Sequence, residues 1–571
     1  MSTPGILAAR AVHQYRRRDI LTYVGLRQHL RNRSAQRDVW GNDIATALVM
    51  ERSAGCYHPI STFKEIGADG ELTFRELLLP PPHETLAEAA LLAACAAAGG
   101  PFGPHPSVFS YELSSGNEVN GIFRPYFRGF IDRHKAIAAA CRGNPTAVVI
   151  HTDVRRFYPS ITGEVARAAW LTACEAANLG TTYRTLGSKI LADYERAKTD
   201  GAVLTGPMFS HMLGNLVFRA IDNEMSTRAP GCYFRYVDDV AIVAPSQMAI
   251  ALEHHLERLL EVRGLTLNSK KRLEVPAAEW VKSEADFDDV AGPSWKSFVG
   301  QMKQMLMLYP DVREYLRAQF QEHGIRIRPL DYSEVEQERS YLTRTATLLK
   351  RRWFRRKTRS LAMLPVVAEC LALRKQYFSD AQNLLSRFNQ LDGFERKRSL
   401  YRLRFLTSRL VYIAHPDDLK FMEDALAGVP EFAMVSTVFR CLHDGDVTPL
   451  LRFGPAAAQA AAQPLKALSR PLRCRPREWS DVSVQAYAIL RLNGITFSEG
   501  PSNTPDDPLI RFCEWDDRAR SLWDSRNAYF RELACVHGMT KTDLNSWAIE
   551  TAFDRDDDLV FDMQELMQGS S

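Results

Sequence analysis

Two apolar runs near the middle of the chain predict a β-hairpin. Residues 232–234 and 240–243 each have the length and character of a short buried strand. Asp238 and Asp239 stand between these runs, so they fall where the connecting turn is expected. A third apolar run, residues 147–152, predicts another buried strand, and it delivers Asp153 at its end.

The rest of the pattern predicts one more hairpin and many helices. Residues 63–66 and 71–75 flank Asp69-Gly70, a dipeptide typical of hairpin turns, and a further strand is expected at 108–113. Beyond about residue 330 the chain is mostly helix-patterned, with a break or loop expected at 455–476. Upstream helices are expected near residues 83–98, 161–178, 183–198, 210–222 and 247–262.

Composition sets limits on the class of protein. A chain of 571 residues has room for two to four domains with ample cores. The net charge is only +4, so any surface for nucleic acid must be local. The ten cysteines form no Cys-x-x-Cys pair, which indicates neither a zinc ribbon nor a disulfide framework. With no secretory signal and no apolar run long enough to span a bilayer, the sequence predicts a cytoplasmic protein without a membrane partner.

The three aspartates at predicted strand ends carry the candidate chemistry. Adjacent carboxylates such as Asp238 and Asp239 repel each other and oppose the burial of the strands beside them. A divalent cation removes that cost, and Mg²⁺ prefers one or two carboxylates together with phosphate oxygens, which suits phosphoryl transfer. An isolated Asp-Asp pair is more often a solvated acidic turn. The third carboxylate, Asp153, favours the metal site.

Four motifs, in this order, resemble those of the reverse transcriptases. They are Asp153 followed by Phe157-Tyr158-Pro159-Ser160-Ile161, a Gly-rich helix start at Gly206-Pro207, Tyr236-Val237-Asp238-Asp239, and Gly264-Leu265 followed by Lys270-Lys271. The hairpin near residue 70 matches the place of a fingers hairpin. The resemblance covers about residues 60–275 and implies an α+β right-hand polymerase, with fingers and palm, that acts as an RNA-directed DNA polymerase.

The resemblance also implies a role for each matching residue. Two Mg²⁺ ions, for which Mn²⁺ can substitute, would be held by Asp153, Val154, Asp238 and Asp239. Lys271, with Lys270 as the alternative, would protonate the leaving pyrophosphate. The Tyr158 ring would lie under the sugar of the incoming dNTP and exclude a 2′-hydroxyl. The other residues expected to contact the nucleotide are Lys64, Arg75, Arg156, Phe157, Gly206 and Pro207.

The second motif and the downstream region suggest a branch of the family. Gly206-Pro207 with Ser210 replaces the Pro-Gln-Gly of retrons and group II intron enzymes, and is closer to the abortive-infection and defence-associated reverse transcriptases. Membership of that branch implies a role in antiphage defence and a homo-oligomeric enzyme. Its DNA product would be attached to a tyrosine or copied from a non-coding RNA template. Two alternatives stay open. One is a retron or intron-type enzyme that copies a structured RNA, and the other is a toxin with a C-terminal ribonuclease at Arg531 and His537 or at Arg409 and His415.

The C-terminal part is expected to be a large all-α domain, with HEAT-like repeats as one form. The expected domains are 1–60 (helical), 60–290 (fingers and palm), 290–340 (connection or thumb) and 341–571. Two stretches in it, 344–359 and 396–409, mix bases with aromatic residues, a composition suited to a single nucleic-acid strand. A solvated helix face is the alternative. The candidate nucleic-acid contacts are Arg351, Arg352, Trp353, Arg355 and Arg356.

Overall fold

The computed structural model of the chain is mostly helical, with two small β-sheets among the described residues. The chain divides into two compact units, which we describe separately. The first comprises Met1–Ile60, Glu76–Asp288 and Arg520–Gly538, and the second Ser61–Arg75, Asp289–Ala519 and Met539–Ser571. The structure describes residues 4–15, 19–32, 56–67, 69–114, 121–197, 203–283, 294–309, 312–329, 359–468, 470–515 and 517–534.

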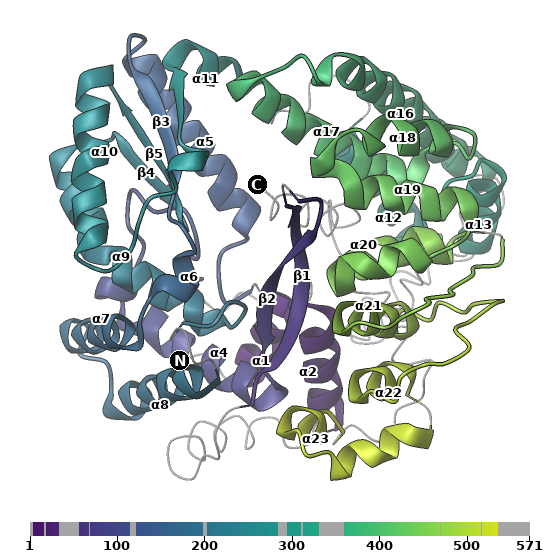
Figure 1. Cartoon of the computed structure of the whole chain (residues 1–571), viewed down its shortest axis with the longest axis horizontal. Helices are drawn as coiled ribbons and strands as arrows, with labels where there is room; N and C mark the ends of the chain where they lie inside the picture. The colour runs from purple at the N-terminus through teal and green to yellow at the C-terminus, as the bar shows by residue number, and fades with distance from the viewer. Residues whose placement is uncertain are drawn as a thin grey trace. The chain divides into compact units, whose positions relative to one another are not determined.

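The first unit is built around a four-stranded antiparallel sheet with the strand order β4-β5-β3-β6. Its strands are β3 (Val148–Asp153), β4 (Tyr233–Tyr236), β5 (Asp239–Ala244) and β6 (Leu273–Pro276). Five of the six residues in each of β3 and β5 are buried, so both faces of the central strands are covered. The helices α5 (Tyr126–Gly143) and α10 (Ser246–Glu261) pack against these strands from opposite sides (Figure 1).

The long helix α9 (Met208–Arg228) of the first unit contacts α4, α7 and α10. The helix α7 begins at a side-chain cap, where the Thr162 hydroxyl accepts the Val165 N–H at 3.4 Å. The remaining helices of this unit are α1 (Pro4–Tyr15), α2 (Ile20–Asn32), α4 (Pro82–Ala98), α6 (Phe157–Ser160), α7 (Gly163–Ala176), α8 (Thr181–Ala197), α11 (Ala277–Ser283) and α23 (Ala528–Ala534).

The hairpin expected near residue 70 is confirmed. It consists of β1 (His58–Ile66) and β2 (Leu72–Leu79), which form a two-stranded sheet. The turn is closed by a 2.7 Å hydrogen bond from the Gly67 N–H to the Glu71 carbonyl. Gly70 has φ +84°, a conformation that glycine adopts without steric cost.

The second unit is an array of helices, in which α19, α20, α21 and α22 each pack against the next along the chain (Figure 1). The described residues of the C-terminal half are mostly helical, which agrees with the helix-like sequence pattern. The helices are α12 (Trp295–Leu308), α13 (Arg313–Glu322), α16 (Arg359–Phe388), α17 (Gly393–Ile413), α18 (Asp418–Ala427), α19 (Ala433–Asp444), α20 (Gly454–Lys466), α21 (Asp481–Leu492) and α22 (Pro508–Glu514).

Two arginines, the buried Arg326 and the half-buried Arg374, cap the C-terminus of α17. Arg326 donates to the carbonyls of Val411 and Ala414, each at 2.8 Å, and Arg374 donates to the carbonyls of Ile413 and His323. The last carbonyls of a helix have no partner within it, and the C-terminal end of a helix dipole favours positive charge. Burial nevertheless lowers the pKa of Arg326 to about 9, with Arg374 adding repulsion.

Two local predictions are wrong. Residues 108–113 do not form a strand, because Tyr111 has φ +50° and interrupts the extended backbone. Only isolated bridges remain, including a parallel one between Val108 and Arg235. Residues 455–466 of the expected break at 455–476 belong to the helix α20 instead. Alanine has the highest helix propensity, and Pro455 stands in the first turn, where its missing N–H costs nothing.

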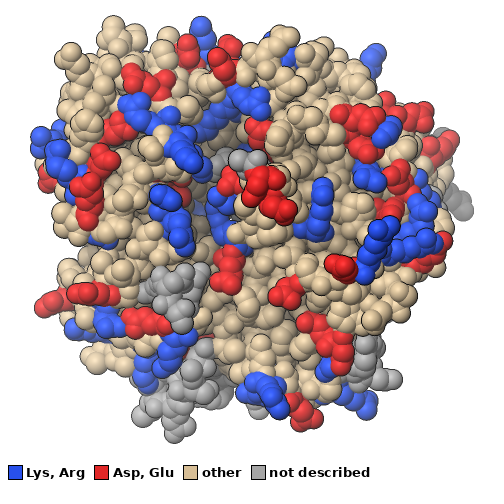
Figure 2. Space-filling view, viewed as in Figure 1, with Lys and Arg blue, Asp and Glu red and all other residues tan. Residues whose placement is uncertain are grey.

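Charges of both signs are mixed over the face in Figure 2, in line with 72 basic and 68 acidic residues. The basic stretch 396–409 lies on α17, and its arginines are largely engaged inside the second unit. Arg404 is 1% and Arg409 5% exposed, and the Arg409 guanidinium lies 3.4 Å from the centre of the Phe405 ring. Arg396 and Arg402 form ion pairs. In the described part of the chain, no helix is both long and apolar enough to cross a membrane.

Candidate active site

The strand register of the first unit brings the aspartates together. Asp153 ends β3 and stands directly opposite Asp239, the first residue of β5. Side chains opposite each other on antiparallel strands have Cβ atoms about 5 Å apart. Asp238 precedes Asp239 in the turn, and its carbonyl accepts the Val154 N–H at 3.0 Å. The three carboxylates thus lie at one end of the sheet.

Asp153 is the most enclosed of these groups. Asp153 is 7% exposed, and its Oδ1 atom is buried with no hydrogen-bond partner among the described residues. The other oxygen, Oδ2, lies 3.4 Å from Lys271 Nζ. Burial raises the pKa of Asp153 and Asp239 raises it further, while Lys271 and Asn268 oppose the rise. An enclosed carboxylate with one unused oxygen can accept a cation.

The fourth motif lies alongside Asp153. The Asn268 N–H donates to the Asp153 carbonyl at 2.8 Å, and the Arg155 N–H donates to the Thr266 carbonyl at 2.9 Å. Lys271 follows at the end of the 3₁₀ turn η3 (Ser269–Lys271), which sets its ammonium group beside Asp153. Of the two adjacent lysines, Lys271, the first choice from the sequence, is the one that contacts the Asp153 carboxylate.

A histidine that the sequence did not single out shares this face of the sheet. His151 stands two residues before Asp153 on β3, so its side chain points to the same side. Its Nε2 lies 4.0 Å from Asp239 Oδ1, and its ring stacks on Trp280. Only the register of β3 against β5 reveals it.

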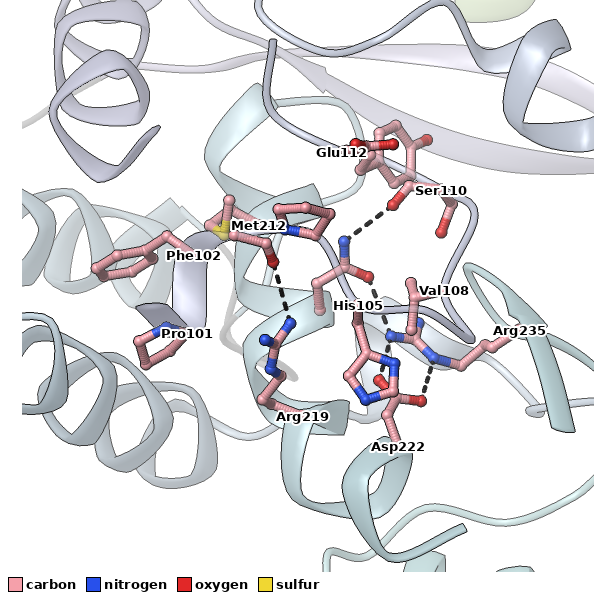
Figure 3. Close-up of a pocket in the computed structure, with 14 residues that line it drawn as sticks. Pro101, Phe102, His105, Val108, Ser110, Glu112, Met212, Arg219, Asp222 and Arg235 are labelled. Carbon is pink, nitrogen blue, oxygen red and sulfur yellow. Dashed lines mark hydrogen bonds and ion pairs between the residues drawn. The ribbon is translucent and has the colours of Figure 1, made fainter. Parts of the chain in front are cut away.

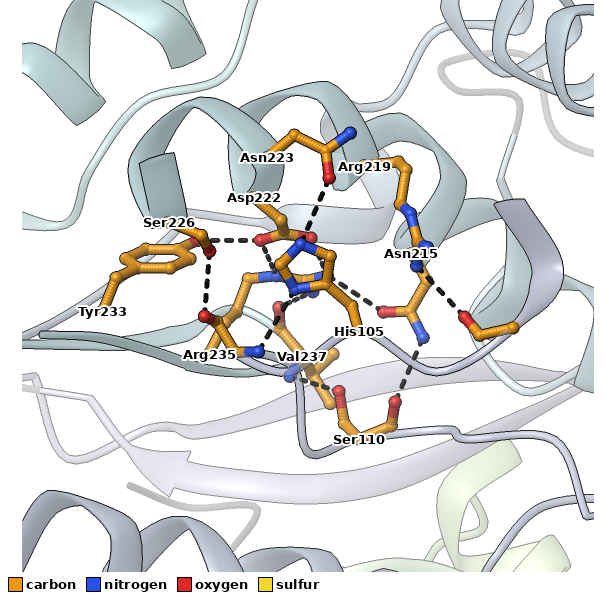
Figure 4. A network of polar contacts seen from close by, with 12 residues as sticks. His105, Ser110, Asn215, Arg219, Asp222, Asn223, Ser226, Tyr233, Arg235 and Val237 are labelled. Carbon is orange, nitrogen blue, oxygen red and sulfur yellow. Dashed lines mark hydrogen bonds and ion pairs between the residues drawn. The ribbon is translucent and has the colours of Figure 1, made fainter. Parts of the chain in front are cut away.

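The turn between β4 and β5 has a strained backbone that is held at both of its peptide groups. Val237 has φ +56°, which a β-branched residue rarely adopts. Its N–H donates to Ser110 Oγ at 2.7 Å, and its carbonyl accepts Arg235 Nη1–H at 2.8 Å (Figure 4). These bonds fix the backbone immediately before Asp238.

Arg235 belongs to a buried polar network between β4 and α9 (Figure 4). Its guanidinium bonds Asp222 through two contacts of 2.8 and 2.7 Å, and both side chains are 1% exposed. Asp222 also accepts the Tyr233 hydroxyl at 2.9 Å, and Asn215 Oδ1 accepts Arg235 Nη2–H at 3.2 Å. Although burial opposes the charge, Asp222 leaves the pKa of Arg235 raised.

The cavity beside this network is small (Figure 3). It measures about 20 Å³, which is room for about one water molecule. Its polar lining includes His105, Arg219, Asp222 and Arg235. A space of this size fits a bridging water rather than a substrate.

The aromatic pair of the first motif is divided between core and site. Phe157 is buried and packs edge-on against Phe218 of α9. Tyr158 is partly exposed, and a hydrogen bond of 2.7 Å joins its hydroxyl to His211 Nδ1. A Cβ added at Gly214 would lie 3.0 Å from Phe157 and 3.4 Å from Tyr158, so this glycine gives both rings their room.

Gly206 and Pro207 lie where the second motif meets β2. Gly206 has φ +124°, and a Cβ there would lie 2.8 Å from the Leu78 carbonyl oxygen. The Leu78 N–H donates to the Thr205 carbonyl at 2.8 Å. Glycine is therefore required by the packing of this segment, whatever its role toward a nucleotide.

The remaining candidates for contact with a nucleotide or a nucleic acid lie at exposed or partly exposed positions or outside the described residues. Arg156 is exposed, with φ +48° at the start of α6. Arg75 is exposed on β2, and Lys64 on β1 pairs with Glu65, both in the part of the hairpin that belongs to the second unit. The five candidates for nucleic-acid contact, Arg351, Arg352, Trp353, Arg355 and Arg356, lie outside the described residues.

The ribonuclease alternative gains no support. His537 lies outside the described residues, so the pair with Arg531 has no described geometry. In the other pair, Arg409 is buried over Phe405, while His415 lies beside Asp417.

The residues present fit a magnesium site completed by a substrate. The described residues include no group of three or more His, Cys, Asp and Glu that forms a metal site by itself. Mg²⁺ does not require such a group, because it is usually bound by one or two carboxylates, waters and substrate phosphates. The unused, buried Oδ1 of Asp153 opposite Asp239 matches that arrangement.

Comparisons with known proteins give only a weak likeness. No family model matches the sequence, and a search of curated proteins found no match. Among solved structures, the chain is similar to apo telomerase from Candida tropicalis truncated from the C-terminal domain, with 12% identity, a TM-score of 0.26 and coverage of 42% of this chain and 55% of that one. It is also similar to telomerase from Candida albicans in complex with a TWJ fragment of telomeric RNA, with 11% identity, a TM-score of 0.28 and coverage of 65% and 67%.

A third structure, apo telomerase from Candida tropicalis, matches with 11% identity, a TM-score of 0.27 and coverage of 70% and 74%. The chain thus spans about half the length of the first of these structures. TM-scores this low carry no argument about fold or chemistry, so the interpretation of the site depends on its geometry.

Proposed function

We propose that the chain is a reverse-transcriptase-like DNA polymerase that adds deoxynucleotides from dNTPs by nucleotidyl transfer. One observation carries the proposal: Asp153 and Asp239 stand opposite each other on β3 and β5, with Asp238 in the turn and Lys271 beside Asp153. Carboxylates at adjoining strand ends, with an ammonium group at 3.4 Å, suit a metal-bound triphosphate.

The residues divide the work as follows. Asp153, Asp238 and Asp239 would bind two Mg²⁺ ions, or Mn²⁺, beside Val154. When bound, the metal stabilises negative charge that develops on the transferred phosphoryl group. Lys271 lies within reach of the same place and would donate a proton to the leaving pyrophosphate. Tyr158 would select the deoxyribose sugar.

The test removes the charges without changing the size of the side chains. Asp153→Asn and Asp238→Asn should each abolish incorporation of radiolabelled dNTPs in Mg²⁺ buffer, while the circular dichroism spectrum stays unchanged. Loss of one like charge does not destabilise a carboxylate cluster. Asp481→Asn, at an exposed position of α21 in the second unit, is the control and should retain activity. Near wild-type synthesis by either site variant would refute the proposal.

The two adjacent lysines offer a matched comparison. Lys271→Ala should lower the rate of incorporation about 10²-fold or more, the usual contribution of a general acid. Lys270→Ala removes the same charge from the same turn, and its effect should be much smaller because Lys271 has the contact with Asp153. Equal losses would mean that the turn supplies only general positive charge.

The biological setting follows from the resemblance of the motifs. We infer an antiphage role for a homo-oligomeric enzyme, with a DNA product that is attached to a tyrosine or copied from a non-coding RNA. Expression of the wild-type chain should lower phage plating, and the Asp153→Asn chain should not. Sequencing the nucleic acid that co-purifies distinguishes the templates. Random or homopolymeric DNA attached to protein supports the abortive-infection type, whereas one unique DNA sequence supports the retron type.

A further inference from the structure

The Tyr158 hydroxyl is anchored by a histidine that lies in the second motif. His211 is in the first turn of α9, immediately after the Gly206-Pro207 segment. Its Nδ1 and the Tyr158 hydroxyl are 2.7 Å apart, and the tautomer of the ring decides which atom donates. A tyrosine ring has two free torsions, and a hydrogen bond at its tip restricts both.

His211 is itself immobilised by aromatic neighbours. Its ring stacks on Tyr111 with 3.8 Å between the ring centres and an angle of 4° between the planes. Phe123 packs edge-on against both rings, at 5.3 Å from Tyr111 and 6.1 Å from His211. The histidine is 5% exposed. The His211 ring therefore cannot rotate away from Tyr158 without disturbing this stack. A water molecule cannot take the place of the ring without disturbing it either.

Tyr111 is held in a backbone conformation that aromatic residues avoid. Its φ is +50°, and such outliers persist only where the surrounding structure enforces them. The preceding residue, Ser110, accepts the Val237 N–H at 2.7 Å and so ties this segment to the turn that carries Asp238. The strained residue thus links the turn of the aspartates to the stack that anchors Tyr158.

We propose that His211, braced by Tyr111, positions the Tyr158 ring and thereby determines how strongly the enzyme discriminates between deoxyribonucleotides and ribonucleotides. This inference rests on the proposed polymerase function, in which Tyr158 lies under the incoming sugar. A ring that is fixed at its hydroxyl cannot move aside for a 2′-hydroxyl. A ring that has lost this anchor can do so, and ribonucleotide incorporation rises.

The test is a double-mutant cycle. The kcat/KM values for dATP against ATP, and for dGTP against GTP, are measured in Mg²⁺ for the wild type, Tyr158→Phe, His211→Leu and the double variant. One hydrogen bond corresponds to about a 3- to 10-fold change. Each single variant should therefore lower the deoxy/ribo ratio by about that factor. The double variant should lower it no further, because both changes remove the same contact.

Two further variants separate positioning from general disruption. His211→Asn keeps a polar atom near Nδ1 and should restore most of the lost discrimination. His254→Leu, at an exposed position of α10, makes the same kind of change elsewhere and should leave the ratio unchanged. If His211→Leu fails to fold, Tyr158→Phe still tests the contact, because it removes only one oxygen atom.

The outcomes that contradict the inference differ from those that contradict the polymerase function. Additive losses in the double variant, or an unchanged ratio in both single variants while Tyr158→Ala lowers it, would overturn the role of His211. A wild-type enzyme that incorporates dNTPs and rNTPs equally would overturn the assignment of Tyr158 and the inference with it. A wild-type protein that incorporates neither would overturn the polymerase function itself.

Discussion

Replacing either member of the buried Arg235–Asp222 pair should cost about 3–5 kcal/mol of local stability, because it leaves an uncompensated charge in the interior. Both side chains are 1% exposed and joined by two hydrogen bonds, so neither charge can reach water without opening the unit. The stability costs of the single variants Asp222→Leu and Arg235→Met then add up to at least about 6 kcal/mol. In the double variant both charges are gone.

The groups left without a partner determine the cost of the double variant. They are the Tyr233 hydroxyl, the Val237 carbonyl and the Asn215 side-chain carbonyl. At about 1 kcal/mol for each group, the double variant costs about 3 kcal/mol. The coupling energy between the two positions is therefore about 3 kcal/mol. Catalysis should not recover in parallel, because the Val237 carbonyl still lacks its donor and the turn before Asp238 is no longer held.

Hydrogen exchange measured by mass spectrometry on peptides from α9 and β4–β5 reports local opening free energies for this cycle. The control is Glu195→Gln, which breaks the exposed Arg167–Glu195 ion pair and should cost less than about 1 kcal/mol. Additive costs would show that the pair is not coupled. A double variant with wild-type incorporation would show that the network does not position the turn.

Three other changes test the structure away from the aspartates. Burial raises the pKa of Glu88 to about 8 from an ordinary value of 4.5, so the folded chain holds an extra proton between these values. Its stability should fall as the pH rises through that window, by at most about 1.4 kcal/mol per pH unit, and Glu88→Gln should remove this slope in pH-dependent unfolding. Gly206→Ala should destabilise the first unit by about 1–3 kcal/mol in hydrogen exchange, whereas Gly180→Ala, with open space around it, should not. Neutralising five bases of the stretch 344–359 should weaken binding to all single strands alike, lower the salt slope by up to about one unit per lost phosphate contact, and shorten products without preventing single-nucleotide incorporation. The five bases are Lys350, Arg351, Arg352, Arg355 and Arg356. Long products with an unchanged salt slope would exclude a role in strand binding.

The strands that carry the aspartates could be predicted because their signals are local. Residues 148–153 and 239–244 are almost entirely buried, and such strands appear in a sequence as continuous apolar runs with polar residues at their ends. The short strand β6 was missed, since four residues that end in Pro276 give too little pattern. Its place beside β3 follows from pairing, which no local window contains.

The supporting residues could not be predicted for a different reason. Asp222 and Arg235 are 13 residues apart on a helix and a strand, and only the folded chain shows that they meet. His211 lies 53 residues from Tyr158 and resembles any histidine in a helix. The arginines of 396–409 show the converse, because a dense basic stretch suggests a surface, whereas Arg404 and Arg409 are buried.

The irregular segment at Ser110 and Tyr111 explains why a strand was expected there and why none forms. A regular strand would use its N–H and carbonyl groups to pair with a neighbouring strand. Here the Ser110 carbonyl accepts the Asn215 side-chain amide, and Ser110 Oγ accepts the Val237 N–H. The Tyr111 ring stacks on His211. Ser110 is the buried residue of this segment, and its polar groups hold the turn before Asp238. One short segment thus holds both the turn before Asp238 and the His211 ring that anchors Tyr158. A shift of the turn should therefore displace this ring, and a shift of the ring should displace the turn.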